Sequence, residues 1–337
     1  MIRVGVIGAG GIGRAHVKRI VSGIPGAAVV AVNDINSELA KDVAREYGIR
    51  YEEDPHQLIR SEDVDAVIVA TWDKTHEEFV VSAINAGKYV FCEKPLADTS
   101  EGCRRIMDAE IVGGKKLLMV GFMRRYDTGY RQMKELIAKG NIGEPLLVHA
   151  QHRNAAPTGE THTTEMSVSG ALVHEFDITR WLVGDTYATA QFIAPKSTRN
   201  ATADLLDPQM IILSTKSGIH IDMEIYMNCR YGYDIQCEVV GEYGTVRLPD
   251  PATAIFRHDG TCSKEVYMGW ARRFTDAYET EMQEWVNCVE KGDLIGCPTA
   301  WDGYVAAVVA EACTKARVAA QMVDIDMIEM PAFYRWR

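Results

Sequence analysis

The glycine-rich start of the chain constrains its fold more than any other segment. Residues 2–13, IRVGVIGAGGIG, join an apolar run to glycines at positions 8, 10 and 13. This GxGxxG pattern between a strand and a helix is typical of a dinucleotide-binding turn, although alone it also fits glycine-rich turns of other α/β proteins. Gly8 allows the tight turn, Gly10 admits a pyrophosphate, and Gly13 permits close helix packing. The anion would lie at the helix N-terminus.

A carboxylate at the end of the second predicted strand strengthens this interpretation. Asp34 stands 21 positions after Gly13, where an acidic residue accepts hydrogen bonds from an adenosine ribose diol. A carboxylate there repels the 2′-phosphate of NADP, and no arginine follows it in DINSE. The sequence therefore predicts NAD as the preferred cofactor.

Residues 1–121 alternate short apolar runs with helical patterns. The runs IRVGVIG, AVVAVND, VDAVIVAT, KYVFCEK and KLLMVGF suit strands that are buried on both faces. Between them, helical patterns begin at an N-cap Ser37 and at Thr75, and each ends at a glycine. We expect an N-terminal Rossmann domain over residues 1–121, with a doubly wound parallel sheet.

Residues 122–337 show a different order of predicted helices and strands. Helical patterns over about 127–139 and 171–183 flank the strand-like PLLVHAQH. Consecutive strand patterns follow in QMIILST, GIHIDMEIYMN, YDIQCEVVGEYGTVRL and TAIFRH, and helical patterns over 275–290 and 302–321 close the chain. Strands in succession favour an antiparallel sheet, so we expect an α+β domain for substrate binding and oligomerisation, with a large, mostly antiparallel sheet.

Composition excludes several classes of partner. The formal net charge is −11 and there is no basic run, which disfavours nucleic acid and anionic membranes. The first predicted strand follows Met1 directly, and no apolar run is long enough to span a bilayer. The eight cysteines form no CxxC pair. We expect a cytoplasmic enzyme with reduced thiols and no metal. The histidines lack metal-ligand spacing, and His16 is assigned to a helix without a partner.

Two further segments carry candidate chemistry. In CEKP, residues 92–95, Lys94 follows a strand, where its charge would stabilise an alkoxide; Pro95 would fix the turn, for which a cis peptide is one solution. A solvated Glu-Lys pair is the alternative. In SGALVHEFDITRWL, residues 169–182, His174 lies on a predicted helix, and histidine titrates near neutral pH, as a proton acceptor requires.

With these motifs in place, the chain resembles the Gfo/Idh/MocA family of NAD(P)-dependent oxidoreductases. GVIGAGGIG, AVND, FCEKPLA and VGFMRRYD carry that resemblance. The longer segments GEPLLVHAQHRN, LVHEFDITRWLV, YGYDIQCEVVGE and CPTAWDGY are similar to the inositol dehydrogenases of that family. The resemblance runs from Met1 to about Tyr334, which is nearly the whole chain.

The resemblance implies roles for individual residues. Lys94 would contact both nicotinamide and substrate, and His174 would accept the proton. It also implies cofactor contacts at Ile12, Thr71, Trp72, His76 and Glu93, and substrate contacts at Met123, Arg124, Asn154 and Tyr233. For both Arg124 and Arg153, a salt bridge is the alternative to a role in the site, and this alternative is stronger for Arg153. The resemblance also implies a homotetramer.

One position departs from the family pattern. The family carries an aspartate four residues before the catalytic histidine, one helical turn away, and this chain has Gly170 there. Asp177 belongs to the family pattern and is therefore not a substitute, whereas Glu165 or Glu175 would be candidates. His174 would then work unassisted, or with another carboxylate, or oxidation would be impaired.

The resemblance implies NAD-dependent oxidation of a secondary hydroxyl of a cyclic polyol. The leading expectation is myo-inositol to 2-keto-myo-inositol (scyllo-inosose). Another cyclitol or a pyranose sugar, such as scyllo-inositol or glucose, is the first alternative, because each presents a six-membered ring with equatorial hydroxyls. An NAD-binding sensor that has lost catalysis is the second, and Gly170 is what motivates it.

Overall fold

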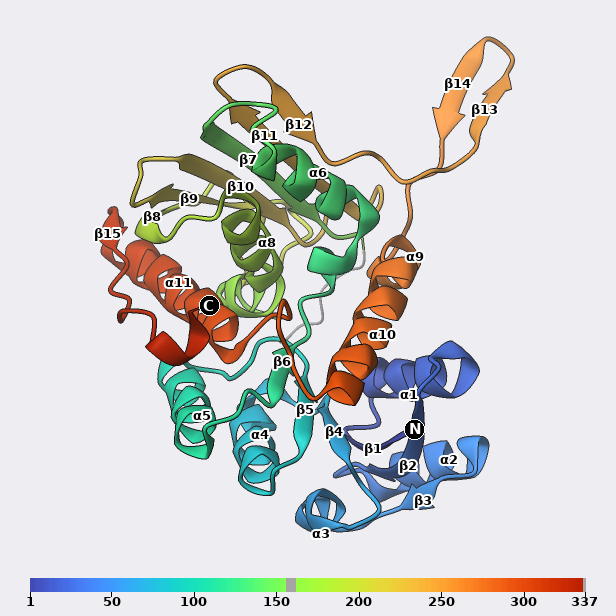
Figure 1. Ribbon diagram of the computed structural model, residues 1–337. Helices are drawn as coiled ribbons and strands as arrows, with labels where there is room; N and C mark the ends of the chain where they lie inside the picture. The colour runs from blue at the N-terminus through green and yellow to red at the C-terminus, as the bar shows by residue number, and fades with distance from the viewer. Residues whose placement is uncertain (156–161, 336–337) are drawn as a thin grey trace. The chain divides into compact units, whose positions relative to one another are not determined.

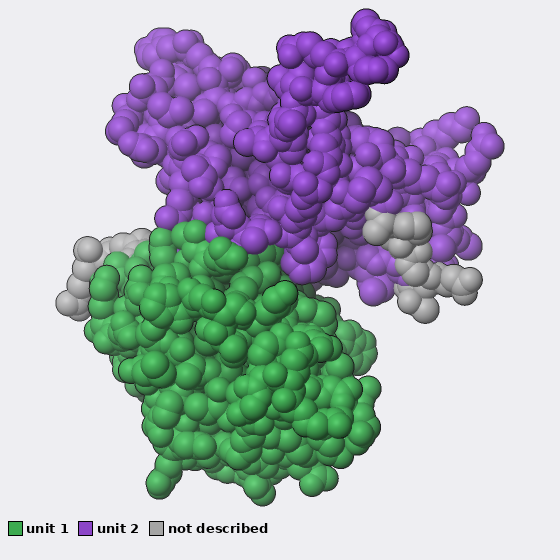
Figure 2. All heavy atoms as spheres, turned by 90° about the vertical axis from the view of Figure 1, so that its right-hand side faces the viewer, with its two compact units in different colours: residues 1–123, 278–308, 327–337 green, residues 124–277, 309–326 purple. Residues whose placement is uncertain are grey.

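The computed structural model describes residues 1–155 and 162–335 and contains two compact units (Figures 1 and 2). Unit 1 consists of Met1–Met123, Tyr278–Val308 and Met327–Arg337. Unit 2 consists of Arg124–Ala277 and Val309–Asp326. Among the described residues, no helix is long and apolar enough to cross a membrane.

In the described part of unit 1, six strands form one parallel sheet in the order β3-β2-β1-β4-β5-β6. The strands are β1 (Ile2–Ile7), β2 (Ala27–Asn33), β3 (Arg50–Tyr51), β4 (Ala66–Val69), β5 (Tyr89–Cys92) and β6 (Leu118–Val120). All four residues of β4 are buried, as the continuous apolar run VDAVIVAT predicts. The strand order reverses between β1 and β4, which is where open α/β sheets bind ligands.

Helices link these strands. They are α1 (Gly11–Gly23), α2 (Ser37–Tyr47), α3 (Pro55–Arg60), η1 (Asp73–Thr75), α4 (His76–Asn85) and α5 (Ser100–Gly113). Because connections between parallel strands are right-handed as a rule, the strand order puts α1 and α2 on one face of the sheet and α4 and α5 on the other. The N-cap of α2 is Asn36, whose side chain accepts from the Leu39 N–H at 3.3 Å, so the predicted N-cap Ser37 is wrong by one residue.

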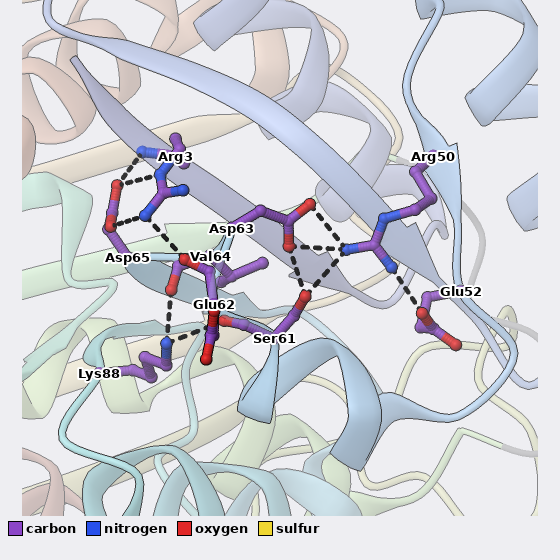
Figure 3. A network of polar contacts seen from close by, with 9 residues as sticks. All are labelled: Arg3, Arg50, Glu52, Ser61, Glu62, Asp63, Val64, Asp65 and Lys88. Atoms are coloured by element: carbon purple, nitrogen blue, oxygen red, sulfur yellow. Dashed lines mark hydrogen bonds and ion pairs between the residues drawn. The ribbon is translucent and has the colours of Figure 1, made fainter.

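A polar network ties together the segments at the amino ends of β1 and β4 (Figure 3). The Arg3 guanidinium binds the Asp65 carboxylate through Nε (2.9 Å) and Nη2 (2.7 Å). Lys88 Nζ donates to the carbonyls of Ser61 (3.0 Å) and Val64 (2.6 Å). The hydrogen bonds from Arg3 lower the pKa of Asp65 to about 2, so this carboxylate stays charged through the physiological range.

The chain returns to unit 1 near its end, and this differs from the expected division at residue 121. The long helix α10 (Thr275–Lys291) joins unit 1 from Tyr278 onward. Trp285 of α10 is fully buried, and its ring lies 5.7 Å from that of Phe91 in β5. The expectation assigned all of residues 122–337 to the second domain, but this packing fixes α10 to the first sheet. The first part of α11 (Ala300–Ala319) and η4 (Ala332–Tyr334) also belong to unit 1.

In the described part of unit 2, seven strands form a mixed sheet in the order β12-β11-β7-β10-β9-β8-β15. Its strands are β7 (Pro145–Arg153), β8 (Tyr187–Ile193), β9 (Gln209–Thr215), β10 (His220–Tyr226), β11 (Asp234–Gly241), β12 (Thr245–Arg247) and β15 (Val323–Asp324). Strands β7 and β10 pair in parallel, and the other described pairs are antiparallel. The expected mostly antiparallel sheet is therefore confirmed.

Short helices and a hairpin complete unit 2. They are η2 (Met123–Tyr126), whose first residue ends the first segment of unit 1, α6 (Thr128–Ala138), α7 (Thr164–Met166), η3 (Ser167–Ala171), α8 (Val173–Val183), α9 (Trp270–Arg273) and the second part of α11. The hairpin of β13 (Ile255–His258) and β14 (Thr261–Lys264) projects from the unit, and every residue of both strands is exposed (Figure 1).

Candidate active site

The glycine turn after β1 has the geometry that a dinucleotide requires. Gly8 has φ +100°, and a Cβ there would lie 2.4 Å from the Ala70 carbonyl oxygen. A Cβ on Gly13 would lie 1.9 Å from the Gly8 carbonyl oxygen, so packing demands glycine at both positions. A Cβ on Gly10 would meet no described atom within 4 Å. The backbone at Gly10 is therefore open to a ligand.

The start of α1 adjoins this open space. The helix begins at Gly11 with Gly10 as its N-cap; no described side chain caps it, and its first turn has no acidic residue. Ile12 lies in that first turn and is half-buried. Such an N-terminus favours an anion, because its N–H groups and dipole point toward it. These residues fit the pyrophosphate of NAD.

Asp34 lies directly after β2 and is bound to the glycine turn. Its Oδ2 accepts from the Ala9 N–H at 2.6 Å, and its Oδ1 accepts from the Asn36 N–H at 2.8 Å. Each carboxylate oxygen keeps a further lone pair for a hydroxyl donor. The position and the acceptor chemistry thus fit a ribose diol.

The turn after β4 holds three of the predicted cofactor residues. Thr71 Oγ1 accepts from Thr75 Oγ1 at 2.8 Å, and the Trp72 side chain is largely exposed. The buried His76 ring joins two turns, because Nδ1 lies 2.7 Å from the Pro95 carbonyl oxygen and Nε2 lies 3.1 Å from that of Thr71. Burial lowers the pKa of His76. His76 therefore lies between the turn after β4 and the CEKP turn, and its neutral ring can donate to one of the two carbonyls.

The CEKP turn follows β5, and the cis peptide considered for Pro95 is confirmed. Lys94 is half-buried, and its backbone N–H lies 3.3 Å from Glu93 Oε2. Glu93 is buried, and its Oε1 lies 2.7 Å from His16 Nε2. The expectation that His16 has no partner is therefore wrong. The pairing joins positions 77 apart in the chain, which no local pattern indicates.

His174 lies in the first turn of α8 in unit 2 and is buried. The five residues before the helix cap, Ser167–Ala171, form a π-helix that includes Gly170. The sequence predicts that Gly170 and His174 lie one turn apart on a regular α-helix, and the π-helix changes that spacing. Such π-helical segments are frequent at functional sites. A Cβ on Gly170 would meet no described atom within 4 Å, so a larger side chain has room there.

The carboxylates considered as replacements for the missing aspartate have other partners. Glu165 pairs with Arg317, and Glu175 pairs with Arg124. Asp177 binds Arg125, with Nε donating to Oδ2 at 2.8 Å. Glu165 and Glu175 are thus each engaged in an ion pair with an arginine.

Arg124 is almost completely buried in unit 2, within a cluster of charged and aromatic side chains. Its guanidinium pairs with Glu175 and lies 5.6 Å from the centre of the Phe274 ring. His152 Nδ1 lies 3.0 Å from Glu175 Oε2 and 3.3 Å from Arg124 Nη2. Burial alone would raise the pKa of Glu175, but the charges and hydrogen bonds of Arg124 and His152 together hold this pKa below its usual value. The salt bridge considered for Arg124 is thus present.

The remaining predicted substrate residues fall in both units. The Tyr233 ring packs edge-on against the His152 ring at 5.7 Å, beside the Arg124 cluster. Asn154 follows β7, and its backbone N–H donates to the Tyr226 carbonyl at 2.8 Å. Met123 is buried and is the last residue of the first segment of unit 1. Arg153 binds both oxygens of Glu224, at 2.6 and 2.7 Å, which is the salt bridge given as its alternative.

No group of three or more His, Cys, Asp or Glu side chains within residues 1–155 and 162–335 is arranged to hold a metal ion. Most of the predicted site residues of unit 1 lie in or beside the glycine turn, the turn after β4 and the CEKP turn, and most of those of unit 2 lie around His174 and Arg124.

Comparison with known proteins gives consistent matches. A model of an oxidoreductase family with an NAD-binding Rossmann fold matches residues 2–122, and a model of its C-terminal alpha/beta domain matches residues 134–325. The chain is 50% identical over 336 residues to inositol 2-dehydrogenase of Burkholderia cenocepacia, covering 99% of each. It is 49% identical over 335 residues to inositol 2-dehydrogenase of Azotobacter vinelandii, covering 99% of this chain and 98% of that protein.

A solved structure also matches over the full length. Myo-inositol dehydrogenase from Lactobacillus casei, in complex with NAD(H) and myo-inositol, is 39% identical with a TM-score of 0.96. The match covers 99% of this chain and 100% of that one. The chain belongs to the Gfo/Idh/MocA family of NAD-dependent oxidoreductases.

Proposed function

We propose that this enzyme oxidises a secondary hydroxyl of myo-inositol with NAD, giving 2-keto-myo-inositol. The observation that carries the proposal is the 50% identity to an inositol 2-dehydrogenase across 99% of both chains. The L. casei neighbour, solved with NAD(H) and myo-inositol, supports the same class of substrate.

The nucleotide cradle supports NAD as the cofactor. Gly8, Gly10 and Gly13 would admit the pyrophosphate at the start of α1, and Asp34 would accept from the ribose diol. We propose further contacts from Ile12, Thr71, Trp72, His76, Glu93 and Lys94. The bound dinucleotide supplies the hydride acceptor.

Two side chains divide the remaining chemistry in this proposal. His174 accepts the hydroxyl proton, because a neutral imidazole is basic near the working pH. The Lys94 ammonium stabilises the alkoxide as it forms, and its charge disfavours imidazolium. Met123, Asn154 and Tyr233 are proposed to position the ring. For Arg124 we propose that the salt bridge to Glu175 positions the guanidinium beside Tyr233, since both side chains belong to one buried cluster.

Gly170 motivates each of two alternative functions. The open space at Gly170 is compatible with a different ring, such as scyllo-inositol or glucose. Glycine in place of the aspartate also motivates an NAD-binding sensor with impaired catalysis.

A substrate panel separates these alternatives. We expect purified enzyme with NAD and myo-inositol to produce reduced cofactor faster than with scyllo-inositol, glucose or NADP. Faster turnover of another ring would favour the first alternative. Tight NADH binding without turnover of any polyol would favour the sensor.

We also propose that the enzyme is a homotetramer, as its family resemblance implies. Light scattering coupled to gel filtration measures the mass directly. A monomeric or dimeric mass at micromolar concentration would contradict the proposal.

A further inference from the structure

His16 occupies the interior of unit 1 with both ring nitrogens engaged. The residue lies on α1 with no exposed surface, and its ring packs edge-on against Phe91 at 5.3 Å and Tyr278 at 6.3 Å. Nε2 lies 2.7 Å from Glu93 Oε1, and Nδ1 lies 3.2 Å from Arg19 Nη1. The imidazole therefore connects a guanidinium to a carboxylate.

The identity of the donors fixes the tautomer of this histidine. A guanidinium has only donors, so His16 Nδ1 must accept from Arg19. The ring proton then resides on Nε2, which donates to Glu93 Oε1. Arg19 is itself held in place, since its guanidinium lies 4.5 Å from the centre of the Tyr278 ring. Hydrogen bonds thus run in one direction, from Arg19 through His16 to Glu93.

Glu93 is the point at which this chain of hydrogen bonds reaches the proposed catalytic lysine. One carboxylate oxygen accepts from His16, and the other lies 3.3 Å from the backbone N–H of Lys94. Burial alone would raise the pKa of Glu93, but the hydrogen bond from His16 and the charge of Lys94 hold it below its usual value.

Several titratable and charged groups surround this carboxylate. They are His16 and Arg19 of α1, Lys94 of the same turn, His76 of α4 and the Cys92 thiol of β5, with Tyr278, Glu279 and Glu281 of α10 around Arg19. Since His16 donates directly to Glu93, removing that donor exposes the carboxylate to the full effect of its burial.

We propose that Arg19, His16 and Glu93 form a positioning relay that orients the Glu93 carboxylate and fixes the turn that carries Lys94. The inference rests on the proposed function, which assigns Lys94 its catalytic role. The relay residues are positioning residues: Arg19 sets the tautomer of His16, His16 donates to Glu93, and Glu93 holds the Lys94 backbone.

The pH dependence of turnover follows from this arrangement. In the parent enzyme Glu93 stays ionised at neutral pH. Without the His16 donor, burial raises the pKa of Glu93, so the carboxylate becomes protonated as pH falls through a higher value. The backbone of Lys94 then loses its contact with an ionised Glu93 at a pH where the parent keeps it. As pH is lowered, kcat therefore begins to fall at a higher pH than in the parent.

The kinetic test compares His16→Leu with His16→Gln, whose amide retains a donor and an acceptor. With myo-inositol and NAD, we expect His16→Leu to lower kcat roughly tenfold or more, since small displacements of a catalytic group are costly. We also expect the acid limb of the kcat profile to move up by about one pH unit, and His16→Gln to restore much of both. His56→Leu, a matched change at a half-exposed histidine of unit 1 that pairs with Glu78, should leave the profile unchanged.

A second measurement does not depend on turnover. In protein with isotope-labelled histidine, nitrogen-proton correlation spectra should place the His16 proton on Nε2 only, with the signal identified by its loss in His16→Gln. Arg19→Met should relax that tautomer preference, and it serves as the kinetic variant if His16→Leu does not fold. A proton on Nδ1 in the parent, or an acid limb in His16→Leu or Arg19→Met equal to that of the parent, would overturn the relay. Absence of myo-inositol turnover in a parent enzyme with the Nε2–H tautomer would instead count against the proposed function.

Discussion

Glu175 pairs with Arg124 in the interior of unit 2, where neither side chain is more than 2% exposed. The second oxygen of Glu175 lies 3.0 Å from His152 Nδ1. The carboxylate that directly follows His174 in the sequence is thus used to neutralise a buried guanidinium.

This pairing predicts a large loss of stability when the carboxylate is removed. Glu175→Ala leaves the Arg124 charge buried and uncompensated, which costs about 3–5 kcal/mol in comparable pairs. The free energy of unfolding in urea measures the effect. Glu165→Ala is the matched control, because Glu165 pairs with Arg317 but its side chain is 45% exposed, and we expect a loss of about 0–1 kcal/mol. Equal losses in the two variants would contradict the assignment.

Gly170 offers a test of how His174 functions. A side chain at position 170 meets no described atom at its Cβ, so an aspartate fits without displacing the backbone. If His174 works unassisted, Gly170→Asp should raise kcat for myo-inositol at neutral pH, because a carboxylate stabilises the imidazolium that forms. Gly170→Asn matches the size without the charge and should not raise kcat. A rate in Gly170→Asp no higher than in the parent would count against an unassisted histidine.

Lys94→Ala should abolish turnover while NAD binding stays measurable. The ammonium is proposed to stabilise the alkoxide, whereas the glycine turn and Asp34 are proposed to hold the nucleotide. Fluorescence titration with NADH measures binding separately from the rate. Lys88→Ala removes a lysine that binds the Ser61 and Val64 carbonyls, and it should retain activity. Appreciable turnover in Lys94→Ala would refute the role of Lys94.

Asp34 is expected to control the choice between NAD and NADP. Asp34→Asn keeps an acceptor for the Ala9 N–H but removes the charge that repels a 2′-phosphate. We expect the ratio of kcat/KM for NAD over NADP to fall roughly tenfold, which corresponds to about 1.4 kcal/mol. Steady-state kinetics with both cofactors gives this ratio. A ratio that stays at the parent value would show that Asp34 does not discriminate.

Local sequence signals predicted much of the fold and part of the candidate site. The glycine turn and the place of Asp34 after β2 follow from short motifs, and the Lys94–Pro95 peptide has the cis form that the motif allowed. The helix expected over 127–139 is α6 (Thr128–Ala138), with Asp127 as its N-cap, because capping is also local.

Features that depend on distant packing were not predictable in this way. Burial of Trp285 against Phe91 assigns most of α10 to unit 1, and the partner of His16 lies 77 positions away. The π-helix over Ser167–Ala171 has the same apolar pattern as an α-helix, so the changed spacing between Gly170 and His174 was missed. The sequence allows either a substrate contact or a salt bridge for Arg124, and the structure shows the salt bridge to Glu175.

The most direct test of myo-inositol oxidation is kcat/KM for NAD reduction, measured for myo-inositol beside scyllo-inositol and glucose under the same conditions. We expect the highest value with myo-inositol, 2-keto-myo-inositol as the product, and no reduced cofactor when Lys94→Ala replaces the parent. A higher kcat/KM for another ring, or no reduction of NAD by myo-inositol in an enzyme that binds NADH, would contradict the proposed function.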